Sequence, residues 1–238
     1  YRLGLFHEEG REIEQNLVEA IKMYRFGTEQ GNFNAMQRLA RCYYEGIGVE
    51  QNKEEAKRLY IEISRMVIEQ SDGIEWKENG EIEWSFDELN KRLIIKGKGP
   101  LEDYTDGRKT CQMRDHPNDD PSWYVRYKDQ IRSVVVCYGV HSIGNFEFKL
   151  CRYLNSVVLL NSMAIIGESA FANCKALISI TLPGSITSIG CRALFGCHNL
   201  ASITIPDSVV YIGDEAFSGC SMLTSITVPN SVQEIGDY

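Results

Sequence analysis

Residues 131–238 carry a pattern of apolar and polar positions that returns every 23 residues. Segments 179–201 and 202–224 are identical at 11 of 23 positions without a gap, whereas composition alone would give about one or two identities. Each repeat contains a short stretch of alternating polar and apolar side chains, such as residues 202–205, which predicts a strand. A unit repeated in this way predicts a solenoid of stacked coils, whose copies of that strand lie in parallel about 4.8 Å apart.

The residue types that keep the 23-residue interval predict which side chains face the core. The Ile-Gly pair recurs, beginning at Ile143, Ile166, Ile189, Ile212 and Ile235, and proline recurs at Pro183, Pro206 and Pro229. The best-preserved copy has apolar residues at the positions expected to point inward. These are Leu200, Ile203, Ile205, Val209, Ile212, Ala216, Phe217 and Cys220.

Four of the eight cysteines occupy one position of the repeat: Cys151, Cys174, Cys197 and Cys220. Their spacing favours a buried column of reduced thiols, although adjacent members lie near bonding distance and disulfides stay open as an alternative. Four ligands in a line cannot surround a tetrahedral zinc ion. Cys191 differs, because its register partners are polar, and we expect this thiol to be exposed. Those partners are Asn145, Glu168, Asp214 and Asp237.

The outward positions of the stacked strands form rows of short side chains and make a candidate binding face. One row is mainly serine and the other threonine, with valine taking the threonine register in the earlier coils. The face comprises Val135, Ser156, Val158, Ser179, Thr181, Ser202, Thr204, Ser225 and Thr227. Two interpretations stay open: a solvated sheet of small hydroxyl residues, or a surface that binds a ligand. The face has no aromatic or arginine side chain of the kind that dominates protein interfaces.

Residues 1–70 are predicted to be helical. Apolar residues recur there at three-to-four spacing, and the first 99 residues contain no proline. A shift of 36 residues superimposes Leu3–Tyr24 on Leu39–Tyr60 with 9 of 22 identities, as expected for helix-turn-helix repeats. Gly46 and Gly48 are expected to turn with positive φ. Asn52 is expected to cap a helix that runs from Lys53 to about Glu69.

Residues 71–130 lack this periodicity and are expected to form an adaptor. Segments 81–86 and 92–96 are predicted to be strands of a hairpin. A polar loop is expected over 102–121, followed by a short helix over 122–129.

The sequence motifs of both repeats resemble those of known families. Asn34-Ala35, Leu39-Ala40, residues 43–49, Gln51-Asn52 and Glu55-Ala56 resemble the Sel-one-like repeat, a relative of the tetratricopeptide repeat. Residues 200–220 resemble the BspA-type leucine-rich repeat, and the order of Trp84, residues 92–104 and 121–123 is similar to the module that precedes it. The resemblance implies an α+β repeat protein. In it, a short α-solenoid is joined through a β-containing adaptor to a leucine-rich-repeat β-solenoid with parallel stacked strands. The adaptor is expected to cap the β-solenoid.

Composition and motifs exclude several classes of partner and of functional site. The net charge of −8 and the absence of a basic cluster in the sequence argue against nucleic acid as a partner. No apolar run reaches the length of a membrane span. The four histidines lie in different expected elements, so we expect no catalytic, cofactor or metal site. Residues 115–120 are expected to be a solvated turn and not a metal loop. Tyr43, Tyr44 and Tyr60 are read as core and groove-edge residues, with a ligand box as the alternative.

These observations predict a non-catalytic scaffold for protein–protein recognition, with a partner that the sequence does not identify. Two alternatives stay open: a bacterial cell-surface adhesin, and the regulatory region of a larger enzyme-containing protein. The chain begins at Tyr1 within a repeat, so we expect it to be cut from a longer protein. A reduced cysteine column fits the cytoplasm, whereas the resemblance fits the cell surface. The last coil, over 226–235, is expected to be open and available for self-association.

Overall fold

The computed structural model describes residues 1–10, 14–71, 75–79, 81–101 and 123–237. The chain divides into two compact units, Tyr1–Asp72 and Gly73–Tyr238. The first unit is helical and the second is built on parallel strands, which confirms the repeat architecture predicted from the sequence. The expected adaptor and the 23-residue repeats fall within one unit, and the finer division into 1–70, 71–130 and 131–238 stays a prediction.

The first unit consists of helices whose starts are set by asparagine side chains. Asn16, Asn32 and Asn52 each accept, through Oδ1, a hydrogen bond from the backbone N–H three residues later, at 2.9 to 3.0 Å. Each bond satisfies a donor that has no partner within its own helix. The predicted cap at Asn52 is therefore confirmed. The helices are α1 (Arg2–Glu9), α2 (Leu17–Glu29), α3 (Phe33–Glu45) and α4 (Lys53–Glu69), and consecutive helices pack together.

The 36-residue repeat of this unit is visible in its hydrogen bonds. The N–H of Asn16 donates to a carbonyl of α1 at 2.9 Å, and that of Asn52 donates to a carbonyl of α3 at 2.8 Å. The predicted positive φ is found at both turn glycines, with values of 78° at Gly46 and 65° at Gly48. Two helical hairpins with the same turn chemistry therefore follow one another.

The second unit begins with a hairpin that continues into the repeats. β2 and β3 are antiparallel and confirm the predicted strands 81–86 and 92–96 to within one residue. On its other edge β3 pairs in parallel with β5, so that Leu93 lies beside Val134. The hairpin therefore supplies the first rungs of the repeat sheet. The strands of this part are β1 (Lys77–Asn79), β2 (Ile82–Asp87), β3 (Arg92–Gly97), β4 (Gly99–Pro100) and β5 (Ser133–Val136).

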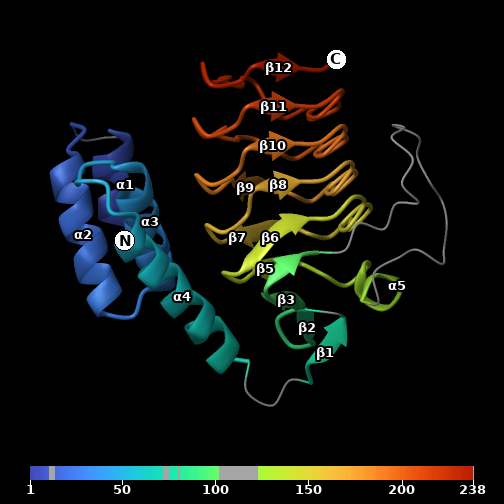
Figure 1. Ribbon diagram of the computed structural model, residues 1–238, viewed down its shortest axis with the longest axis horizontal. Coiled ribbons are helices and arrows are strands. Elements are labelled where there is room, and N and C mark those ends of the chain that lie inside the picture. Colours follow the sequence, from blue (N-terminus) through green and yellow to red (C-terminus); the bar gives the residue numbers. More distant parts are fainter. Residues whose placement is uncertain (11–13, 72–74, 80, 102–122, 238) are drawn as a thin grey trace. The chain divides into compact units, whose positions relative to one another are not determined.

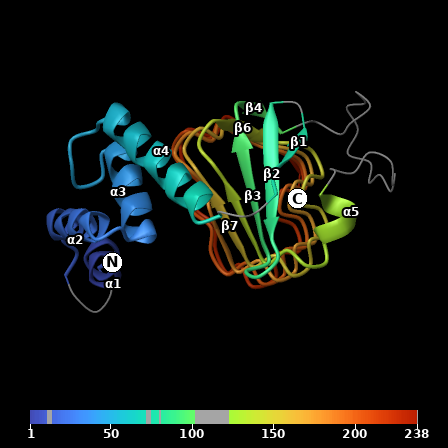
Figure 2. The same cartoon turned by 90° about the horizontal axis from the view of Figure 1, so that it is seen from below.

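Two sheets form two sides of the solenoid, and successive coils stack upon one another (Figure 1). The first sheet has the order β1-β2-β3-β5-β7-β9 and the second β12-β11-β10-β8-β6-β4. Seen from below, the coils share nearly one outline (Figure 2). Ser156 lies beside Ser179, and Ile166 lies beside Ile189, which confirms the 23-residue register. The remaining elements are α5 (Tyr124–Tyr127), β6 (Val140–Ile143), β7 (Ser156–Leu159), β8 (Ile165–Ile166), β9 (Ser179–Thr181), β10 (Ser188–Ile189), β11 (Tyr211–Ile212) and β12 (Glu234–Ile235).

The prediction of a strand over 202–205 is wrong. The first sheet ends at β9, and beyond it the described coils contribute one isolated bridge, between Ser179 and Ser202. Proline removes one hydrogen bond from this side. The N–H of Leu160 donates to the carbonyl of Val136 at 3.3 Å, but that position is Pro183, Pro206 and Pro229 in the later coils, and proline has no N–H to donate. Because β9 still pairs with β7 beside Pro183, this loss contributes to the end of the sheet but does not account for it alone.

A third side of the solenoid is held by backbone hydrogen bonds that point to the following coil. The N–H groups of Phe146, Phe148 and Leu150 donate to carbonyls one coil further along, each at 2.8 Å. The same bonds recur from Ser169, Phe171 and Asn173. The coils from β5 to β9 are therefore bonded to their neighbours on three sides, and the later coils chiefly on the second and third sides.

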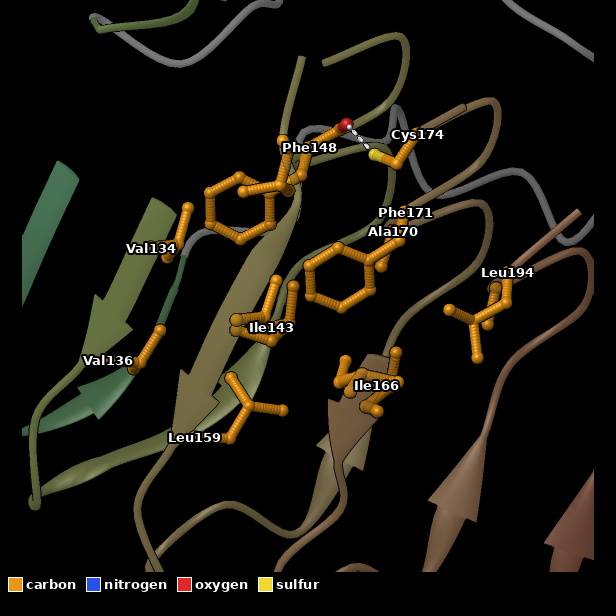
Figure 3. Close-up of a cluster of buried hydrophobic side chains, with 14 of the residues drawn as sticks. Val134, Val136, Ile143, Phe148, Leu159, Ile166, Ala170, Phe171, Cys174 and Leu194 are labelled. Atoms are coloured by element: carbon orange, nitrogen blue, oxygen red, sulfur yellow. Dashed lines mark hydrogen bonds between the residues drawn. The ribbon is translucent and has the colours of Figure 1, made fainter. Parts of the chain in front are cut away.

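The core is a set of vertical files of like side chains (Figure 3). Ile143, Ile166 and Ile189 are at most 1% exposed, which confirms their predicted inward column. Beside them the rings of Phe148 and Phe171 stack with centroids 5.2 Å apart. The adaptor extends this file, because the Trp123 ring stacks on Phe148 with centroids 5.1 Å apart. The coils and the segment before them therefore share one continuous core.

Close backbone contact between coils explains the glycine of each Ile-Gly pair. A Cβ added at Gly190 would lie 2.7 Å from the backbone nitrogen of Glu168 and 2.7 Å from the carbonyl carbon of Gly167. Side chains do not tolerate such distances, and the obstructing atoms belong to the backbone of the preceding coil. Glycine at this position therefore sets how closely the coils stack.

We predict that Gly190→Ala lowers the free energy of unfolding by about 1 to 3 kcal/mol, the usual cost of overpacking. Chemical denaturation followed by circular dichroism measures this change. The matched control is Ser202→Ala at an exposed position, which is expected to stay within about 0.5 kcal/mol of the parent. Equal stability of the two variants would show that the stacking distance is not limited by Gly190.

Candidate functional site

The predicted binding face is largely exposed and keeps the predicted register. Ser156 lies beside Ser179 and Val158 beside Thr181 on adjacent parallel strands. Val158 is half-buried, and the hydroxyl residues of both rows are exposed. These residues are Ser156, Ser179, Thr181, Ser202, Thr204, Ser225 and Thr227. The register of this hydroxyl strip is set by strand pairing as far as Thr181 and by the bridge between Ser179 and Ser202. Its remaining residues are exposed on the later coils.

Val135 does not belong to the exposed part of this face. It occupies the expected register, beside Val158, but only 5% of its surface is exposed. Its neighbour on the other side, Ile94, is fully buried. The expectation that Val135 is accessible is therefore corrected, and the accessible strip begins at Ser156.

The cysteine column bonds each coil to the preceding one. The thiol of Cys174 donates to the carbonyl of Phe148 at 3.0 Å (Figure 3). Cys197 donates to Phe171 at 3.2 Å, and Cys220 donates to Leu194 at 3.3 Å. A sulfur atom at this position is therefore a small apolar group that also satisfies a carbonyl in the neighbouring coil.

Burial makes these thiols poor nucleophiles. It raises the pKa of Cys197 to about 12, and burial also raises the pKa values of Cys151, Cys174 and Cys220 above the usual range. Because the thiolate is the reactive form, the column stays protonated near neutral pH. The four cysteines of the column form no disulfide, and Cys111 lies outside the described residues.

Cys191 is half-buried, and its sulfur lies 4.0 Å from the hydroxyl oxygen of Tyr211. Burial, and then the neighbouring Cys191, raise the pKa of Tyr211 to about 12. The expectation that this thiol is exposed is therefore only partly met, because Cys191 is half-buried. It is the most accessible thiol among the described cysteines.

A second column of side chains between coils was missed by the sequence reasoning. The hydroxyl of Ser162 donates to the carbonyl of Val140 at 2.8 Å, and that of Ser185 donates to Met163 at 2.6 Å. Ser208 repeats the bond to Ile186 at 2.5 Å. The 23-residue interval of these serines was available in the sequence, but it did not reveal that the hydroxyl reaches back to the preceding coil.

The corner between the third side and the hydroxyl strip was also missed. After each column cysteine the N–H of a leucine donates to the carbonyl of that cysteine, three residues earlier, as in Leu154 to Cys151 at 3.0 Å. The leucine is buried in the first three of these turns and half-buried in the last, at Leu223. This tight turn leaves the two intervening residues outside. Tyr153 is 54% exposed and Met222 57% exposed at such positions, and Ile178, just after the next turn, is 57% exposed. Large apolar side chains therefore border the hydroxyl strip, which itself consists of serine and threonine.

The other residues singled out in the sequence do not assemble into a site. Tyr60 is 4% exposed and belongs to the helical core. Tyr43 and Tyr44 are half-buried; Tyr43 accepts a hydrogen bond from Arg25 at 3.0 Å, and Lys53 lies over the Tyr44 ring. Residues 115–120 lie outside the described part of the chain. Among the residues that are described, no group of three or more His, Cys, Asp or Glu could hold a metal ion.

Comparison with known families accounts for both repeat regions. Residues 1–32 and 34–66 match the Sel1 repeat, and residues 124–238 match the BspA type leucine rich repeat region in six copies. The chain therefore carries Sel1 repeats followed by BspA-type leucine-rich repeats, in the order predicted. Both families are typically non-catalytic. No curated protein matched the chain.

Solved structures of bacterial leucine-rich repeat proteins are similar to the chain. A leucine rich repeat protein of T. pallidum is 22% identical with a TM-score of 0.44, and the match covers 69% of this chain and 83% of that one. A leucine rich cell surface protein of Faecalibacterium prausnitzii is 23% identical with a TM-score of 0.42, covering 70% of this chain and 52% of the other. None of the described helices is both long and apolar enough to cross a membrane.

We predict that an alkylating reagent modifies Cys191 before any cysteine of the column. The reason is burial together with the raised pKa values of the column thiols. Labelling the folded protein at mildly alkaline pH and mapping the products by mass spectrometry measures the order. Labelling in denaturant, where all thiols should react alike, is the control. A column cysteine that reacts first in the folded protein would contradict the arrangement.

We also predict that Ser185→Ala lowers the free energy of unfolding by about 1 kcal/mol, because the carbonyl of Met163 loses its side-chain donor. Ser179→Ala, an exposed serine one strand earlier, is the matched control and is expected to be nearly neutral. Denaturation curves of the two variants give the comparison. Indistinguishable curves would mean that the serine column adds nothing to coil stacking.

Proposed function

Because Sel1 repeats and BspA-type leucine-rich repeats stand in one chain, we propose that the protein is a non-catalytic scaffold that recognises a protein partner through the exposed hydroxyl strip. The strip is defined by Ser156, Ser179, Thr181, Ser202, Thr204, Ser225 and Thr227. The observation that carries the proposal is that a rigidly stacked core presents these side chains outward in two regular rows.

Rigidity supports recognition because a preorganised surface loses little conformational entropy on binding. Backbone bonds on the third side, the serine column and the cysteine column all fix each coil against its neighbour. The strip is uncharged, so its hydroxyl groups supply hydrogen bonds without the desolvation cost of a buried charge. Affinity therefore depends on shape and on the apolar residues at the border.

A cell-surface adhesin is the form of this proposal that the cell-surface description of the Faecalibacterium prausnitzii protein favours. In that form the same strip would contact a protein outside the cell. Self-association through the last coil stays a prediction; there Ile235 is 46% exposed. A regulatory region of a larger enzyme-containing protein would use the strip in the same way, on a partner domain.

The test is affinity capture with the full chain from extracts of the cells that produce it, followed by titration of each purified captured protein. We predict that the double variant Thr181→Arg and Thr204→Arg weakens binding at least tenfold, about 1.4 kcal/mol, because two bulky charges occupy the strip. Isothermal titration calorimetry measures the dissociation constant.

The matched control carries two arginines directly before β11 and β12 of the second sheet, as Val210→Arg and Gln233→Arg, at positions that are also exposed. It should bind within about twofold of the parent. Equal loss in both double variants, or a partner that both variants bind normally, would refute the strip as the recognition surface.

A further inference from the structure

The turn that follows each column cysteine places a pair of side chains on the outside of every coil. The N–H of Leu154, Leu177, Leu200 and Leu223 donates to the carbonyl of the cysteine three residues earlier, at 2.9 to 3.0 Å. Cysteine and leucine are inward, so the first residue after each cysteine must face solvent. Stacking then brings these residues into one file along the corner of the solenoid, about 4.8 Å apart.

The lower members of this file are basic. Arg152, Lys175 and His198 occupy the first turn position of three successive coils, and all are exposed. The side chains of Arg152 and Lys175 form no ion pair or hydrogen bond with any described residue. His198 contacts the carbonyl of Gly219 through Nδ1 at 2.9 Å. The three residues are named here the corner file.

The surroundings of the corner file contain few carboxylates. Residues 148–167 and 169–206 contain no aspartate or glutamate, and the remaining arginine of that range, Arg192, is paired with Glu215 at 2.8 Å. At the adaptor end, burial and then the carboxylates of Glu147 and Asp129 raise the pKa of Cys151, whereas Lys128 lowers it. A protein with a net charge of −8 therefore keeps a basic corner whose neighbouring carboxylates are confined to its adaptor end.

Apolar side chains lie beside these charges. Tyr153 follows Arg152 in the same turn and is 54% exposed, and Ile178, three residues after Lys175, is 57% exposed. Tyrosine and arginine are the residue types that most often dominate binding energy at interfaces. Adjacent apolar and cationic groups match a ligand that offers carboxylates next to an apolar side chain.

We propose that the corner file, with Tyr153 and Ile178, is the docking site for an acidic segment of a partner protein that carries apolar side chains among its carboxylates. Arg152 and Lys175 bind the carboxylates, and Tyr153 and Ile178 cover the apolar side chain. The inference rests on the proposed function, since it assigns the chemistry of the protein ligand at the border of the same strip.

A protein segment fits this corner better than a nucleic acid does. Nucleic-acid binding depends on neutralising many phosphates across a broad basic face. The corner file is one residue wide and three coils long, and the rest of the strip is uncharged. A short run of glutamates or aspartates in an extended peptide needs no wider surface.

The experiment measures fluorescence anisotropy of a labelled peptide in which two central leucines are flanked by glutamates on both sides. The full chain is titrated into this probe, and parallel titrations use the same peptide with glutamine for glutamate, and a single-stranded oligothymidylate. We expect the glutamate peptide to bind most tightly, and its affinity to fall as salt is raised, because exposed charges are screened.

The decisive variant is Arg152→Glu with Lys175→Glu, which should weaken binding of the glutamate peptide at least tenfold. The control, Arg2→Glu with Lys57→Glu, makes the same change of net charge at two exposed positions of the first unit and should bind within about twofold of the parent. Circular dichroism confirms that both variants are folded. Tyr153→Ala should weaken binding of the glutamate peptide, because the apolar side chain of the peptide loses its contact with the tyrosine ring.

Three outcomes would overturn the proposal. These are equal weakening by both charge reversals, tighter binding of the oligothymidylate than of the glutamate peptide, and no binding of the glutamate peptide at physiological salt. The double variant Thr181→Arg and Thr204→Arg separates this proposal from the broader one. If this variant no longer binds the captured partner, and the glutamate peptide does not bind the parent protein, then the strip functions in recognition and only the assignment of the corner file fails.

Discussion

Hydrogen bonding between coils is the constraint on which the second unit depends. A single coil cannot bury its apolar side chains or satisfy its backbone groups, so it is stable only when its neighbours are in place. The isoleucine file from Ile143 to Ile189 is buried because every coil lies directly on the previous one. Glycine at Gly190 lets the backbones approach, and the serine and cysteine side chains reach back to carbonyls of the preceding coil.

The same constraint explains the adaptor. The lowest repeat coil needs a partner for its strand edge and a cover for its core, and the chain before it supplies both. β3 pairs with β5 through four residues in parallel register, and Trp123 continues the stack of Phe148 and Phe171. The indole N–H of Trp123 also donates to Glu147 at 3.2 Å. Glu147 stands where the later coils have alanine, at Ala170 for example.

Periodic positions could be predicted from the sequence, and local departures from periodicity could not. The inward isoleucines, the cysteine column and the asparagine cap of α4 follow from interval and residue type alone. At residues 202–205 the first sheet is reduced to one bridge, between Ser179 and Ser202, and the missing N–H of Pro206 contributes to this in a way that appears only when the ladder partner is known. The burial of Val135 depends on packing that register does not encode. The corner file was missed because its members differ in residue type, so no repeat of identity marks it.

The tight turn between cysteine and leucine also has an evolutionary consequence. Its two outer residues contribute nothing to the buried files, so substitutions there leave folding unaffected while they alter what the corner presents. Successive coils already differ at these places, with Arg152 and Tyr153 in one, Lys175 in the next, and Ser221 and Met222 in a later one. Duplication of a coil followed by drift at two positions could thus generate new binding preferences on an unchanged framework.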